Sequence, residues 1–190
     1  MKAHAPDSGA FYLAPWRRAL LDTLGALDGA LDLTPDEEVG YIVHATARIC
    51  SRMAASPPAY VDLSTLTAVR GPMAWRIADT RGLSLREDAA VAALRQVLYA
   101  LRPCLTSEET RLDGYARMLM GSACLMLPGL LYSITCGIGR AMDCHFSWCA
   151  DGSESPDRGL EEAFLRGKAE GMRTVSRTES PTRIGFDRAP

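Results

Sequence analysis

A cysteine–histidine cluster near residue 140 holds the residue types that could bind a metal ion. The cluster consists of Cys136, Cys144, His145 and Cys149. Thiolate and imidazole groups are the ligands of structural zinc, and they usually come in pairs roughly two to four residues apart. This cluster lacks such a pair, and Cys136 belongs to a predicted helix while Cys149 lies beyond its end. Zinc and a disulfide are the alternatives, but ordinary thiols are the favoured interpretation, and we expect no metal or other cofactor.

No motif for nucleophilic or phosphate-transfer chemistry occurs in the sequence. It contains no GxxxxGK[ST], no HExxH and no GxSxG. The three histidines, His4, His44 and His145, are far apart, and His44 falls at the edge of a predicted amphipathic helix. No cysteine or serine lies in a motif that would pair it with one of these histidines. We therefore expect a non-enzymatic protein with no catalytic residue.

Composition is that of an ordinary globular chain. Its 190 residues suit one domain, 47% are hydrophobic, and the net charge is −2, which argues against a nucleic-acid partner. All basic residues except Lys2 and Lys168 are arginine, a bias typical of a GC-rich bacterial or viral genome. The first residues lack the apolar stretch of a signal peptide. This start predicts an intracellular, cytoplasmic protein with reduced thiols.

Periodic apolar residues predict helices along most of the chain. Residues 14–31 carry leucines at steps of three and four, a narrow stripe that could also pair with a second copy of the chain. Thr34, followed by Pro35 and then by Glu37 three residues after the cap, predicts the start of a second helix. That helix is expected to end before Pro57.

Two further capping boxes strengthen the helical interpretation. Residues 84–87 open a predicted helix over 85–102, and residues 106–109 open one over 107–127. Pro128–Gly129 is expected to break or kink the helix before a last helix at roughly 130–142.

The region between the second and third of these helices is less regular. Residues 64–67 indicate a short helix or a loop, and Gly71–Pro72 is expected to start another short helix. A strand here would have no partner strand, so we exclude one.

These patterns together predict an all-α fold, a single bundle of five to seven helices around a hydrophobic central helix. Residues 1–13 are expected to form a flexible leader and residues 14–148 the bundle. The composition of residues 149–190 changes to Ser, Pro and charged types, which predicts a mostly disordered tail. Within it, residues 159–172 indicate a short helix, which is either solvated or docks on a partner.

Residues 118–139 contain no charged side chain and are flanked by Arg117 and Arg140. A helix of this length would span about 33 Å, close to the thickness of a bilayer's hydrocarbon core. Serine, threonine and glycine dilute the stretch, and the apolar face begins upstream of it. We therefore favour a buried core helix. The alternative is a membrane-associated protein that inserts residues 118–139.

A short stretch resembles a known family. Ser107-Glu108-Glu109-Thr110, then Leu112, then Gly114-Tyr115, lie between an alanine-rich helix and an apolar one. This order is similar to the middle of adenoviral Bcl-2-like apoptosis inhibitors. The resemblance implies an all-α bundle that binds amphipathic helices of cell-death proteins in a groove. The family's Asn-Trp-Gly-Arg signature is absent from this chain.

The functional expectation is a protein-interaction module. It would be viral and Bcl-2-like, would regulate host cell death or innate signalling, and would bind a partner's amphipathic helix. Trp75, Tyr99 and Tyr115 are expected to line an apolar groove beside the two helices that open with the later capping boxes.

Overall fold

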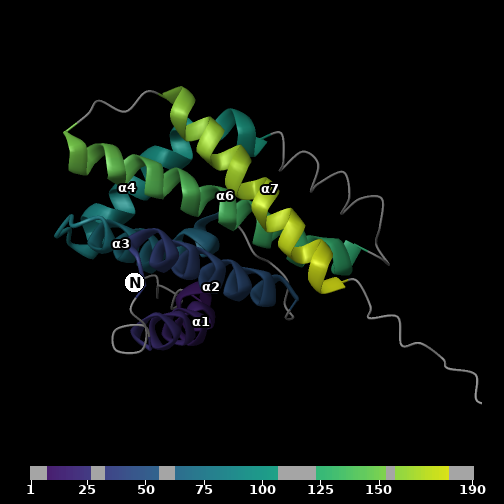
Figure 1. The fold of residues 1–190 in the computed structure, drawn as a ribbon. Helices are drawn as coiled ribbons and strands as arrows, with labels where there is room; N and C mark the ends of the chain where they lie inside the picture. Colours follow the sequence, from purple (N-terminus) through teal and green to yellow (C-terminus); the bar gives the residue numbers. More distant parts are fainter. Residues whose placement is uncertain (1–7, 27–32, 56–62, 107–122, 153–156, 180–190) are drawn as a thin grey trace, which may run out of the picture.

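The computed structural model describes residues 8–26, 33–55, 63–106, 123–152 and 157–179. Within these ranges every regular element is a helix, which confirms the all-α prediction. The helices with described bounds are α1 (Ser8–Gly25), α2 (Pro35–Ala55), α3 (Leu63–Thr80), α4 (Glu87–Ala100), α6 (Ala123–Asp151) and α7 (Asp157–Glu179) (Figure 1). Residues 102–106 are also helical.

Helix α6 is the central helix of the bundle. It contacts α2, α3, α4 and α7, and every residue from 131 to 139 is buried. A helix enclosed by other helices can be apolar on all sides, which explains the uncharged stretch. No helix in the described part of the chain is long and apolar enough to cross a membrane. Residues 118–122 of the stretch lie outside the described residues.

The helix break predicted at Pro128 and the helix start predicted at Gly71–Pro72 are wrong. Helix α6 continues through Pro128, and α3 continues through Gly71 and Pro72. A proline removes one backbone hydrogen bond, and burial of the residues that follow outweighs that loss. Gly71 has a packing role in α3, because a Cβ atom there would lie 2.9 Å from the Val91 side chain of α4.

The first residues of the helices test the predicted capping boxes. The Thr34 side chain caps α2, where its hydroxyl lies 3.4 Å from the Glu37 backbone nitrogen, and Glu37 accepts a bond from the Thr34 backbone at 3.0 Å. This box is confirmed. The predicted box at Ser84 is wrong, because α4 begins at Glu87 and its N-cap is Arg86, which makes no side-chain cap bond. The third box, at residues 106–109, lies mostly outside the described residues.

The first helix begins earlier than predicted. Helix α1 starts at Ser8, so the expected leader over 1–13 is too long, and Pro15 lies inside the helix. A proline tolerates helical backbone angles and so does not by itself mark a start. Leu20 and Leu24, from the predicted leucine stripe, are buried within this chain, where α1 contacts α2 and α3.

The C-terminal region corrects the predicted domain boundary. Residues 157–179 form the 23-residue helix α7, which lies along α6 (Figure 1). Its Leu160 and Phe164 side chains are buried. Gly167 and Gly171 let the two helices approach, because a Cβ atom at either position would lie 2.7 Å from the α6 backbone. The charged composition reflects one exposed face of a packed helix, so the bundle continues beyond residue 148.

Candidate functional site

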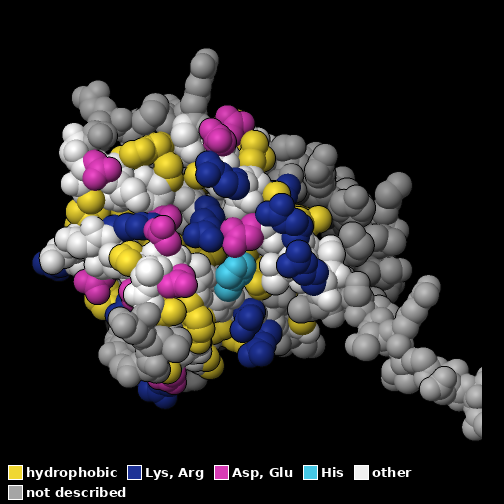
Figure 2. All heavy atoms as spheres, in the orientation of Figure 1, with side chains coloured by type: hydrophobic (Ala, Val, Ile, Leu, Met, Phe, Trp, Pro, Cys, Tyr) yellow, Lys and Arg dark blue, Asp and Glu magenta, His cyan; other side chains and the backbone are white. Residues whose placement is uncertain are grey.

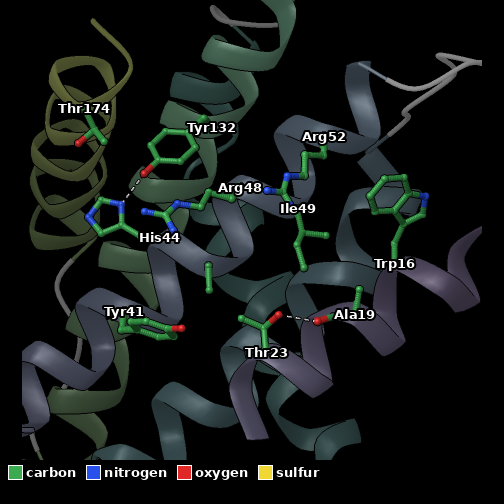
Figure 3. Close-up of a pocket in the computed structure, with 11 residues that line it drawn as sticks. Trp16, Ala19, Thr23, Tyr41, His44, Arg48, Ile49, Arg52, Tyr132 and Thr174 are labelled. Atoms are coloured by element: carbon green, nitrogen blue, oxygen red, sulfur yellow. Dashed lines mark hydrogen bonds between the residues drawn. The ribbon is translucent and has the colours of Figure 1, made fainter. Parts of the chain in front are cut away.

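A solvent-open pocket lies where α1, α2, α6 and α7 meet (Figure 3). Its volume is about 390 Å³. Eleven residues line it: Trp16, Ala19, Thr23, Tyr41, His44, Ala45, Arg48, Ile49, Arg52, Tyr132 and Thr174. None of these eleven side chains is a carboxylate, while two are arginines and one is a histidine.

Helix α2 supplies most of the lining because it is amphipathic. Its Val39, Ile42 and Met53 side chains are buried in the core. Tyr41, Arg48 and Arg52 are exposed, and they lie at helical spacing on the other face. The capped start of α2 and its buried face therefore fix the direction in which the pocket side chains point.

A hydrogen-bonded network that includes two of the lining residues, His44 and Tyr132, joins three helices. The His44 Nδ1 atom of α2 lies 2.8 Å from the Tyr132 hydroxyl of α6, and its Nε2 atom lies 3.3 Å from Glu170 Oε1 of α7. Arg140 donates two bonds to the same carboxylate, each of 3.3 Å. The rings of His44 and Tyr132 are stacked, with their centroids 5.9 Å apart. Together these contacts tie α7 to α2 and α6.

One assignment of protons satisfies every member of this network. Arg48 donates to the Tyr132 oxygen, and the Tyr132 hydroxyl donates to His44 Nδ1. The His44 Nε2–H group then donates to Glu170. This tautomer is assigned from the partners, since a neutral imidazole has one donor and one acceptor.

Burial and neighbouring charges set the protonation of the network. Burial opposes ionisation of Glu170, but the hydrogen bonds and charge of Arg140, with a contribution from His44, outweigh it and lower the pKa of Glu170. Burial raises the pKa of Tyr132, against the effect of Arg48. Glu170 is therefore a carboxylate and Tyr132 a neutral phenol at neutral pH.

Cys136, His44 and Glu170 have the residue types of a cysteine-based triad. Cys136 Sγ lies 3.7 Å from His44 Nδ1. However, burial, followed by the charge of Glu170, raises the pKa of Cys136 to about 12. The thiol is only 1% exposed, and Tyr132 bonds to the His44 atom that would act as base. A buried, protonated thiol is a poor nucleophile.

The residues of the cysteine–histidine cluster are not brought together. Cys136 is buried toward α7, whereas Cys149 is exposed and lies 3.8 Å from His145 on the next turn. No group of three metal-ligating side chains occurs among the described residues. All four residues belong to α6, and Cys136 precedes Cys144 by eight residues, a rise of about 12 Å along the helix axis, which is too far for both side chains to bind one ion.

The residues predicted to bind a partner lie elsewhere or are not described. The Trp75 indole packs against the core and donates a 3.0 Å bond to the Leu85 carbonyl, so it joins α3 to the start of α4. Tyr99 is 76% exposed on α4. Tyr115 lies outside the described residues. Neither Trp75 nor Tyr99 lines the pocket.

Sequence reasoning missed the pocket. The one feature of the sequence that could have indicated the pocket is the pair Arg48 and Arg52, which lie four residues apart on a helix whose other face is apolar. The remaining lining residues come from helices at both ends of the chain, from Trp16 to Thr174.

A second unusual group lies in the core where α2, α3 and α6 meet. Arg70 is fully buried, and its Nη2 atom donates a 2.8 Å bond to Thr135. Its Nε and Nη1 atoms have no hydrogen-bond partner among the described residues. Burial lowers the pKa of Arg70 and raises the pKa of the neighbouring Cys50 thiol. No solvent reaches this pair, so it is separate from the pocket.

No family model, curated protein or solved structure matches this chain. The features that bear on its function are therefore the all-α bundle and the pocket lined by arginine and aromatic side chains.

Proposed function

We propose that this protein is a non-enzymatic interaction module that binds an amphipathic helix of a partner protein. The observation that carries the proposal is the combination of Trp16, Tyr41, Arg48 and Arg52 around one open pocket. Tryptophan, tyrosine and arginine are the residue types most enriched at the energetic centres of protein interfaces. Hydrogen bonds of His44 with Tyr132 and Glu170 hold part of this lining in place.

The proposal places the partner at a different surface from the one that the sequence favoured. The pocket combines concavity with aromatic and charged side chains, which a flat helix face lacks. Of the three residues predicted to line the groove, Tyr99 on α4 is described and exposed. It serves as the reference position in the test below.

The finer form of the proposal comes from the resemblance to viral Bcl-2-like proteins. In this form the partner is a regulator of host cell death or innate signalling, met in the cytoplasm. Its support is the all-α architecture with a buried central helix.

A peptide selection tests the proposal. A displayed library of amphipathic helical peptides is selected on the full chain, and the selected peptides are measured against Tyr41→Ala and Tyr99→Ala variants. We expect Tyr41→Ala to weaken binding at least tenfold and Tyr99→Ala to leave it unchanged. A library that yields no binder contradicts the proposal, and so do binders indifferent to both substitutions. Binders lost only with Tyr99→Ala place the interface on α4 instead.

A further inference from the structure

Helix α7 carries an apolar stripe on its exposed side, separate from the face that packs on α6. Leu165 is 51% exposed and Met172 is 48% exposed, and Ala169 between them is also exposed. The spacing of four and then three residues places all three side chains on one face of the helix, in the pattern by which helices pair. Leu165 and Met172 are two of the four large hydrophobic residues that are exposed in the described part of the chain.

The stripe is complementary to itself in size. The small residue Ala169 lies at its centre, with Leu165 four residues before it and Met172 three residues after it. If two copies of α7 cross antiparallel at Ala169, Leu165 of one copy lies beside Met172 of the other. Their distances from the crossing along the helix axis, about 6 Å and about 4.5 Å, nearly match. A small side chain at the crossing lets the larger ones interdigitate.

The charges of α7 favour the same antiparallel arrangement. Three of the four charged residues in 157–162 are acidic, and four of the five in 166–177 are basic. Figure 2, in the orientation of Figure 1, shows acidic side chains over the first part of α7 and Lys and Arg side chains along its second part. Parallel copies would place like charges side by side, whereas antiparallel copies place each acidic end beside a basic end. Antiparallel helix dipoles also attract each other.

One pair of opposite charges can be assigned across this contact. Glu162 and Arg173 are exposed, and at 3.6 residues per turn they lie about 20° and about 40° from Ala169, to the same side of the stripe. In the antiparallel arrangement Glu162 of one copy and Arg173 of the other lie on the same side of the contact, about 4.5 Å apart along the axis. Glu162 also pairs with Arg166 of its own helix at 3.4 Å, but these side chains are 77% and 73% exposed. Such an exposed pair contributes little, so Glu162 can pair with the second copy.

We propose that α7 pairs antiparallel with α7 of a second copy of this chain, through Leu165, Ala169 and Met172, and that the protein thereby forms a homodimer. None of these three residues lines the pocket, so the dimer goes beyond the proposed function and leaves the pocket open. One pair of helices buries less than the roughly 1,200–2,000 Å² of a standard stable interface. We therefore expect a weak dimer, with a dissociation constant of about 10–100 μM.

Sedimentation equilibrium of the full chain tests the dimer. Over about 5–500 μM, a range that brackets this constant, the mean mass should rise from that of one chain toward that of two. Leu165→Glu and Met172→Glu should each weaken the dimer about tenfold or more, because they bury an unpaired charge in the contact. Tyr99→Glu is the matched control, since it puts the same charge at a residue that is 76% exposed on α4, and it should leave the constant unchanged. Circular dichroism checks that each variant is folded.

A charge exchange at exposed positions tests the orientation. Glu162→Arg and Arg173→Glu should each weaken the dimer, and the double variant should recover most of the loss, because opposite charges again face each other. Parallel helices would give no recovery, since each position would then face its own copy.

Three results would overturn the inference. One is a single-chain mass at every concentration, and another is a dimer that neither α7 glutamate variant weakens more than Tyr99→Glu does. The third is a double charge variant that is as weak as the single ones.

Discussion

Arg70 places a guanidinium group in the centre of the bundle, where Thr135 accepts a bond from only one of its nitrogens. Moving a charge out of water costs several kcal/mol unless it is paired and fully hydrogen-bonded. The neighbouring Cys50 supplies no full negative charge, because burial raises the pKa of its thiol. The group therefore lowers the stability of the fold.

Replacing Arg70 with methionine should stabilise the protein. The substitution keeps a long side chain in the core and removes the buried charge, so we expect the free energy of unfolding to rise by about 1–3 kcal/mol. Urea unfolding monitored by circular dichroism measures the change. Arg70→Ala is the control, because it also removes the charge but leaves a cavity that offsets the gain. A large loss of stability in Arg70→Met would show that the charge has a partner that stabilises it.

Glu170 makes stability depend on pH in the acid range. Its pKa in the folded state is lowered, because the effect of Arg140 outweighs burial. Its contribution to stability is therefore fully present above the pKa of the unfolded chain and is lost as the pH falls through the folded-state pKa. Denaturant unfolding at pH 7 and at lower pH should show this loss. Glu170→Gln should be less stable at pH 7 and should lose less on acidification; an unchanged pH profile would contradict the assignment.

At the scale of elements, the contact between α6 and α7 depends on small residues. Gly137 faces Phe164 of α7, and Gly167 and Gly171 face the backbone of α6. Close backbone approach increases the area over which the two helices pack. It also makes the interface intolerant of added atoms, because a packed interior cannot expand locally without strain.

A single methyl group should loosen this interface. In Gly167→Ala the new Cβ would lie 2.6 Å from Arg140 Cγ and 2.7 Å from the Cys136 carbonyl oxygen. We expect a loss of about 1–3 kcal/mol in the free energy of unfolding, measured by urea denaturation. Gly25→Ala is the matched control, since a Cβ atom at Gly25 would have no neighbour within 4 Å among the described residues. Equal stabilities of the two variants would show that α7 does not pack as described.

At the scale of the whole molecule, α7 completes both the core and the pocket. It covers one side of α6, and its Glu170 joins the network that holds His44 and Arg140. Thr174 of the same helix also lines the pocket. Residues 157–179, whose composition predicted a tail, are therefore part of the folded unit.

Removal of α7 should destabilise the whole bundle. A chain that ends at residue 152 would expose the α6 surface that contacts α7, including Cys136. We expect a lower midpoint of thermal unfolding and increased light scattering, because a large apolar patch promotes association. A chain that ends at residue 179 is the control and should behave like the full chain. Equal midpoints for the two truncated chains would contradict the assignment of α7 to the core.

Local structure could be predicted from the sequence where short-range signals are strong. The Thr34–Glu37 box and the apolar period of α2 specified that helix, because capping and amphipathicity act within a few residues. The absence of charge over residues 118–139 likewise indicated buried core structure, and residues 131–139 of this stretch are buried in α6. The start of α4 was misplaced because a capping motif at Ser84 is a local preference, which tertiary packing can override.

The grouping of residues into one site was determined by the tertiary structure. The pocket joins Trp16, Arg48, Tyr132 and Thr174, and no spacing rule links positions so distant in sequence. The packing of α7 on α6 also depended on tertiary structure. Gly167 and Gly171 allow close packing only because the α6 backbone lies next to them, and the sequence does not show that contact. Side-chain type and helical period are properties of a segment. Contact between segments depends instead on how the apolar faces of all the helices are buried together.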